Sequence, residues 1–95
     1  MHVGVCKIKL FLPMNHDLKG KRRIVNSLTR QIRNKFNVSI IEIESNELWQ
    51  IATIGIGVIS NKITNLNQTI ENIISFIESS NHEVNIISND TDIIT

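Results

Sequence analysis

The sequence predicts a single α+β domain in which two helices cover one face of a four-stranded antiparallel sheet. Its 95 residues are the length of one domain. Four segments rich in apolar residues have the pattern of strands, and two longer segments between them have helical periodicity. The first alternating segment is apolar on one face and half polar on the other, which is typical of a sheet that helices cover on one side only.

Residues 2–12 are predicted to form the first strand. Its core face carries Cys6, Ile8, Leu10 and Leu12. The opposite face carries Lys7 and Lys9 together with Val3, Val5 and Phe11. After a turn that begins at Pro13, Asp17 is a good N-cap for a helix that is predicted to run to about Lys35. The apolar stripe of this helix consists of Ile24, Val25, Leu28, Ile32 and Phe36, with Leu18 near its edge.

Two strands are predicted to follow this helix. Residues 37–44 form the second, in which adjacent Ile40 and Ile41 indicate either a bulge or a strand that is apolar on both faces. Residues 50–59 form the third, with Ala52, Ile54, Ile56 and Val58 on its core face. Gly55 and Gly57 lie on the other face and predict the close approach of another backbone or side chain.

The second helix and a last strand complete the fold. The helix can be capped by Ser60 and Asn61, or by Thr64 and Asn65. Its apolar stripe is Leu66, Ile70, Ile73, Ile74 and Ile77. Residues 83–88 form the last strand, and no element is assigned beyond Asp90. The order βαββαβ predicts a ferredoxin-like domain over residues 1–95, with strand order 4-1-3-2.

The core of this domain follows from the stripes. We expect the following side chains to be nearly fully buried: Ile8, Leu10, Val25, Leu28, Ile32, Ile54, Ile56, Ile70, Ile73 and Ile77. Cys6 is the only cysteine, and no Cys/His spacing indicates zinc. The N-terminal residues do not resemble a signal peptide, and no apolar run reaches the roughly 18 residues that span a bilayer. We therefore expect a cytoplasmic protein without a metal, a cofactor or a membrane partner.

The charges divide sharply along the chain. Residues 1–36 contain nine Lys or Arg and one acid, which is a net charge of +8. Residues 37–95 contain one Lys and eight acids, which is a net charge of −7. Such asymmetry indicates a surface for a polyanion.

Four short motifs carry a resemblance to a known family. They are Leu18-Lys19-Gly20-Lys21-Arg22-Arg23, Asn34-Lys35-Phe36-Asn37-Val38-Ser39, Leu48-Trp49-Gln50 and Val58-Ile59-Ser60-Asn61. In this order and spacing, the chain resembles the YlxP-like family of small bacterial proteins of unknown function. The resemblance implies a ferredoxin-like fold and no established activity, and genes of the family commonly neighbour translation and ribosome-maturation genes. The family tends to have a glutamate at position 20, so Gly20 removes a capping-box partner and predicts a loose helix start.

The first helix carries the best candidate site. One arc of it contains Lys19, Arg22, Arg23, Asn26, Arg30 and Arg33 without an acid. Clustered Lys and Arg bind phosphate backbones, whereas the alternative is a solvated helix face. Lys21 instead falls in the middle of the apolar arc. Either its stem crosses apolar surface to reach water, or the helix begins after it and Lys21 reaches an anion at the helix N-terminus. The candidate nucleic-acid-binding residues are Lys19, Lys21, Arg22, Arg23, Arg30 and Arg33.

The remaining chemically interesting residues do not form a catalytic group. Trp49 is either a contact for a partner, such as a stacked base, or the anchor of a small core, and the second interpretation is favoured. His2, His16 and His82 are scattered, and Cys6 is expected to be buried and inert. Glu42, Glu44 and Glu47 match no calcium-binding spacing and indicate a solvated loop.

Three functions remain open. The first is an accessory protein that binds structured RNA or the ribosome through the first helix. The second is a homodimeric structural or regulatory module that pairs through Val3, Val5 and Phe11 on the open sheet face, or through an edge strand. The third is a small hydrolase such as an acylphosphatase, which the absence of glycine between Pro13 and Lys19 disfavours.

Overall fold

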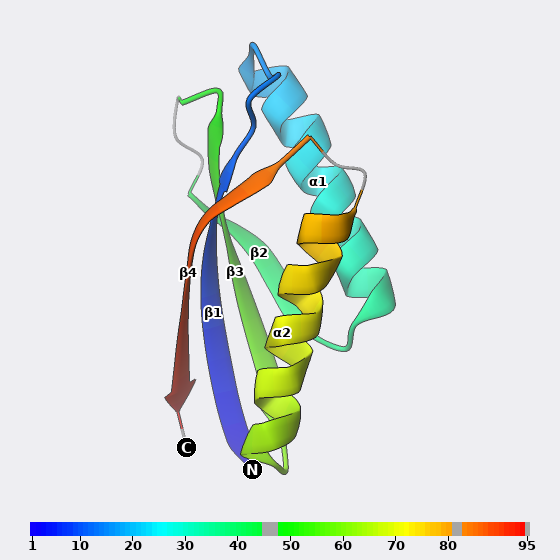
Figure 1. The fold of residues 1–95 in the computed structure, drawn as a ribbon, viewed down its shortest axis with the longest axis vertical. Helices are drawn as coiled ribbons and strands as arrows, with labels where there is room; N and C mark the ends of the chain where they lie inside the picture. Colours follow the sequence, from blue (N-terminus) through cyan, green and yellow to red (C-terminus); the bar gives the residue numbers. More distant parts are fainter. Residues whose placement is uncertain (45–47, 81–82, 95) are drawn as a thin grey trace.

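The predicted architecture is confirmed in a computed structural model, which describes residues 1–44, 48–80 and 83–94. Its elements are β1 (His2–Phe11), α1 (Leu18–Lys35), β2 (Ser39–Glu44), β3 (Ile51–Ser60), α2 (Ile63–Ser79) and β4 (Asn85–Ile94). The strands form one sheet in the order β2-β3-β1-β4, and all neighbours are antiparallel. Both helices lie on the same side of this ferredoxin-like sheet and leave its other face open (Figure 1).

The core lies between the sheet and the two helices. All the side chains that the apolar stripes place in the core are at most 3% exposed: Ile8, Leu10, Val25, Leu28, Ile32, Ile54, Ile56, Ile70, Ile73 and Ile77. Each strand contributes alternate residues and each helix contributes one stripe, as the two periods require. The burial of these side chains removes apolar surface from water and is the main force that holds the layers together.

Helix α1 begins in a well-defined way, and the predicted loose start is wrong. The Asp17 side chain accepts a hydrogen bond from the Gly20 backbone nitrogen, at 2.6 Å. A Cβ atom at position 20 would collide with the side chain of Asn15, which is only 7% exposed. Glycine therefore lets Asn15 pack against the first turn.

Helix α2 begins differently from the prediction. Its N-cap is Lys62, which makes no side-chain capping bond. Ser60 contributes from two residues earlier, because its hydroxyl accepts a hydrogen bond from the Lys62 backbone nitrogen at 3.2 Å. The helix is instead fixed by packing. A Cβ atom on Gly4 of β1 would collide with the fully buried side chain of Leu66, so glycine lets α2 approach the sheet closely.

Strand β2 is apolar on both faces. Ile40 is 4% exposed and Ile41 is 64% exposed, so the alternation continues through this pair. The irregularity in its pairing with β3 comes later, between Glu42 and Glu44. Across from this strand, a Cβ on Gly55 would lie 3.0 Å from the Ile43 side chain, which confirms the predicted close approach. The same prediction is wrong for Gly57, where a Cβ would meet nothing within 4 Å.

Strand β4 is longer than predicted. It continues past Asp90 and pairs with β1 as far as the partners Val3 and Ile94. Most of its side chains are exposed, because β4 is an edge strand that the helices cover only in part. Backbone pairing with β1 holds residues 88–92 in the sheet, and their polar side chains carry no apolar alternation that could have predicted it.

Leu28 is the residue of α1 whose truncation tests the packing of this helix. Leu28→Ala should lower the free energy of unfolding by about 2–5 kcal/mol, because it removes a fully buried side chain and leaves a cavity. Arg30→Ala, at an exposed position of the same helix, should change it by no more than about 0.5 kcal/mol. Chemical denaturation of both variants measures this, and equal losses would contradict the packing described here.

Gly4 and Gly57 offer a second, matched test. Gly4→Ala should destabilise the protein by about 1–3 kcal/mol, because its Cβ collides with Leu66 in a filled core. Gly57→Ala should be neutral or stabilising by up to about 1 kcal/mol, since its Cβ enters open space and the unfolded chain loses freedom. Thermal and urea unfolding of the pair decide it, and a larger loss for Gly57→Ala would be the contrary result.

Candidate functional site

The outer surface of α1 carries a row of cations that we call the basic strip: Lys19, Arg22, Arg23, Arg30 and Arg33. All five residues are exposed. Among the described residues, no carboxylate forms an ion pair with any of them. Arg33 makes one internal contact, in which its guanidinium donates to the Ile40 carbonyl of β2 at 3.2 Å. The other four remain directed at solvent and are available to an external anion.

The position of these cations is unfavourable for the helix itself. The N-terminus of a helix has a partial positive charge, so anions stabilise it and cations do not. Lys19, Arg22 and Arg23 all lie in the first two turns of α1, and the first turn contains no acid. Helix stability therefore does not explain this part of the strip.

Lys21 does not belong to the strip. Its side chain is 3% exposed, and its ammonium group donates to the Leu48 carbonyl at 3.0 Å. The helix begins before it, at Leu18, so the interpretation in which the helix begins after Lys21 is wrong. Lys21 is therefore left out of the basic strip, although it was among the predicted nucleic-acid-binding residues, because a buried ammonium that donates to a loop carbonyl has a structural role.

Asn15 joins Lys21 in fixing the loop that precedes β3. Its side-chain amide donates to the carbonyl oxygens of Trp49, at 2.6 Å, and of Asp17, at 2.7 Å. The Gln50 amide donates in return to the Pro13 carbonyl, at 3.0 Å. The sequence analysis assigned no role to Asn15, because a contact across 34 positions leaves no local signal. Together these bonds hold residues 48–50 beside the start of α1.

Trp49 is not the anchor of a small core, and that interpretation is wrong. Its side chain is 53% exposed although its backbone is tied to Asn15. The neighbouring Leu48 is 59% exposed. An exposed indole whose backbone is held beside the start of α1 is a suitable contact for a partner.

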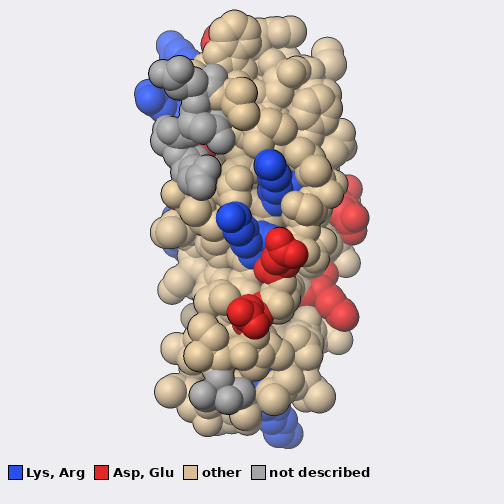
Figure 2. Space-filling model, turned by 90° about the vertical axis from the view of Figure 1, so that its left-hand side faces the viewer, with Lys and Arg blue, Asp and Glu red and all other residues tan. Residues whose placement is uncertain are grey.

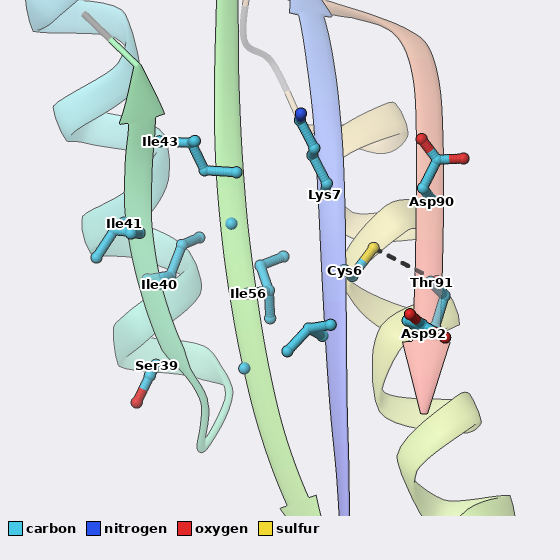
Figure 3. A pocket seen from close by; sticks show the side chains of 13 residues that line it. Cys6, Lys7, Ser39, Ile40, Ile41, Ile43, Ile56, Asp90, Thr91 and Asp92 are labelled. Atoms are coloured by element: carbon cyan, nitrogen blue, oxygen red, sulfur yellow. Dashed lines mark hydrogen bonds between the residues drawn. The ribbon is translucent and has the colours of Figure 1, made fainter. Parts of the chain in front are cut away.

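A shallow apolar groove of about 610 Å³ crosses the open face of the sheet (Figure 3). Gly55 and Gly57 of β3 lie along its middle. Ile41 and Ile43 border it on β2, and Val5 on β1 lies beyond the glycines. The groove ends against β4 at Asp90 and Asp92. Of the three apolar residues that were predicted to make contacts on this face, only Val5 lines it.

The remaining polar residues do not assemble a reactive centre in the described part of the chain. Burial raises the pKa of the Cys6 thiol, and this outweighs the hydrogen bond from Thr91, whose hydroxyl donates to the sulfur at 3.5 Å. A nucleophilic cysteine needs the opposite shift. His16 is exposed, and His82 and Glu47 lie outside the described residues. In residues 1–44, 48–80 and 83–94, no three His, Cys, Asp or Glu come together as metal ligands.

Neither α1 nor α2 is long and apolar enough to cross a bilayer.

The fold places the chain in the class of small ferredoxin-like α+β proteins. Within this class, the family described as "Protein of unknown function (DUF503)" matches residues 3–91, and the chain belongs to that family. The chain is also similar to the uncharacterized protein YlxP of Bacillus subtilis (strain 168). The two are 34% identical over 77 residues, which cover 81% of this chain and 84% of the relative. The family resemblance that the four motifs indicated is therefore confirmed.

Lys21 and Arg22 are neighbours with different roles, and the same substitution should separate them. Lys21→Met should lower the free energy of unfolding by about 1–3 kcal/mol, because the Leu48 carbonyl loses a buried donor. Arg22→Met, at an exposed position, should change it by about 0.5 kcal/mol or less. Denaturation curves measure both, and a greater loss for Arg22→Met would contradict the structural role of Lys21.

Proposed function

We propose that this protein is an accessory factor that binds structured RNA, either free or in the ribosome, through the basic strip of α1. The observation that carries the proposal is the row of exposed cations without an internal ionic partner in the described chain. Three of them lie where they oppose the helix dipole. An external polyanion explains both features.

The strip has suitable dimensions for a nucleic-acid backbone. From Lys19 to Arg33 it extends over roughly 21 Å, at 1.5 Å per residue of helix. This length spans several phosphates, and arginine can contact a phosphate with two parallel hydrogen bonds. Lys35 follows at the end of α1, where its ammonium lies 5.0 Å from the centre of the Phe76 ring. We therefore count Lys19, Arg22, Arg23 and Arg30 as phosphate contacts, together with Arg33, whose single bond to the Ile40 carbonyl leaves other guanidinium N–H groups free to donate, and we do not count Lys35.

The mode of recognition follows from the side chains that are present. The strip supplies charge and hydrogen-bond donors, and the chain has only four aromatic residues. Binding through the sugar-phosphate backbone depends on shape and charge and tolerates changes of sequence. Exposed Trp49 adds one surface on which an unpaired base can stack. We therefore expect affinity for RNA hairpins with a flanking single strand, and little preference for sequence.

The salt dependence of binding tests this proposal. Fluorescence anisotropy with a labelled RNA hairpin at several salt concentrations gives the slope of the logarithm of the binding constant against the logarithm of the salt concentration. The magnitude of this slope should be smaller by about three in the variant Arg22→Gln, Arg23→Gln, Arg30→Gln. Arg33 is left in place because it also binds the Ile40 carbonyl. Hairpins of unrelated sequence should be weakened about equally.

A matched control separates the strip from net charge. The variant Asn61→Asp, Asn67→Asp, Ser75→Asp lowers the net charge by the same amount at exposed positions on or beside α2. It should keep the wild-type slope and lose far less affinity, because it removes no phosphate contact. If the wild type fails to bind RNA, or if both triple variants weaken binding alike, the strip is a solvated face and the proposed function is wrong.

A further inference from the structure

The open face of the sheet has features that its own chain does not explain. Gly57 lies in the interior of β3, between Ser39 of β2 and Val5 of β1. Glycine weakens a strand interior and is typically found where another group comes close. Here a Cβ would meet nothing within 4 Å, so no group of the described chain requires the glycine. The space above Gly57 is part of the apolar groove and is open to a group from outside.

Large apolar side chains surround this space without being covered. Ile41 is 64% exposed, Val5 is 40% exposed and Ile43 is 39% exposed. Further along the same face, Ile59 of β3 is 68% exposed. It pairs with Val3 of β1, and Val3 pairs on its other side with Ile94 of β4, which is 57% exposed. A contiguous apolar face of this kind marks an interaction site.

The charges on this face balance one another. Lys7 and Lys9 project from β1, and Asp90 and Asp92 project from the adjacent edge strand β4. Figure 2 looks onto this side of the molecule and shows a mostly uncharged surface with a small mixed group of basic and acidic atoms near its middle. A second copy of the same face therefore meets no net repulsion, and the lysines of one copy can face the aspartates of the other. The α1 surface, which carries the basic strip, would repel its own copy.

The edges of the sheet are less suitable for self-association. On β2, the Ile40 carbonyl accepts a hydrogen bond from Arg33, so the guanidinium takes one of its two acceptor positions and lies against this strand. On β4, Asp90 and Asp92 line the other edge, and charged residues are a common device against edge pairing. Both edges therefore favour stacking of faces over extension of the sheet.

The face is also large enough. Strands β1, β3 and β4 each have 10 residues, or roughly 33 Å at 3.3 Å per residue. Four strands at about 4.8 Å give a width of roughly 15–19 Å, and the projected area is roughly 500 Å² before side-chain relief is added. This is of the order of the roughly 800 Å² per partner that specific interfaces bury.

We propose that this face binds a second copy of the same chain, so that two sheets stack with their α1 and α2 layers outside. An apolar side chain of each copy enters the groove at Gly57 of the other, and Lys7 and Lys9 face Asp90 and Asp92 across the interface. The arrangement is symmetric, as identical surfaces in a two-fold dimer require. It leaves the basic strips of both copies exposed, and its test does not depend on RNA binding.

Exchange of charges tests the proposed pairing directly. In one variant, Lys7→Glu with Lys9→Glu, all four residues at positions 7, 9, 90 and 92 are acidic. In a second variant, Asp90→Lys with Asp92→Lys, all four are basic. Sedimentation velocity should show a dimer for the wild type and, for each variant alone, a dissociation constant that is at least about tenfold larger. An equimolar mixture should restore the dimer, because opposite faces now meet. Circular dichroism should show that each variant is folded.

The groove is tested by filling it. Gly57→Leu should raise the dissociation constant at least about tenfold without lowering the melting temperature of the monomer, because the new side chain enters space that is empty in one copy. Asn67→Leu, which adds the same side chain at an exposed position of α2, should dimerise like the wild type.

Several outcomes would overturn the proposal. They are a wild type that stays monomeric at millimolar concentration, a mixture of charge variants that does not reassemble, and a Gly57→Leu protein that dimerises normally. A monomer that carries a small apolar molecule in native mass spectrometry would assign the groove to a ligand and would equally overturn it.

Discussion

The structure depends on the burial of one face of the sheet by both helices. Side chains such as Ile8 and Ile54 enter the core with Leu28 and Ile73, and all four are fully buried. Because a strand turns alternate side chains to opposite faces, the same four strands must present a second face. No element of the described chain covers it. The core therefore fixes both the direction of the cationic surface of α1 and the existence of the open sheet face.

The two candidate surfaces are separated by this arrangement. The apolar stripe of α1 points to the sheet, so the basic strip must point away from it. The groove lies on the face of the sheet that is turned away from both helices (Figure 3). The proposed RNA contact on the helix and the proposed contact with a second copy on the sheet therefore use separate surfaces and would not compete.

Close approaches set the finer geometry, and glycines permit them. Gly4 admits Leu66 and so seats α2 on β1, and Gly20 admits Asn15 beside the first turn of α1. Asn15 and Lys21 then hold the backbone carbonyls of Trp49 and Leu48, while the Trp49 side chain remains exposed. A small domain with one layer of helices has little interior, and these few buried polar contacts decide which large side chain stays exposed.

The fold and most of the basic strip could be predicted from the sequence, because both depend on local periodicity. The predictions were wrong for residues whose positions are set by tertiary contacts and not by the local sequence pattern. Lys21 shares a helix with the strip, yet a carbonyl from a distant loop holds it in the interior. Strand β4 extends past Asp90 because its backbone pairs with β1, and this pairing does not require apolar side chains on β4. Trp49 is exposed although tryptophan usually anchors a core of this size.

The sequence by itself determined the order of the elements, the side of each that faces the core and the family, since these follow from residues a few positions apart. Only the tertiary structure decided that Gly57 faces open space while Gly55 lies against Ile43. It also decided that the Arg33 guanidinium donates a hydrogen bond to the Ile40 carbonyl of β2. The physical reason is that such contacts join segments that lie side by side in space through the register of the sheet, and register is a property of the paired strands and not of either strand alone.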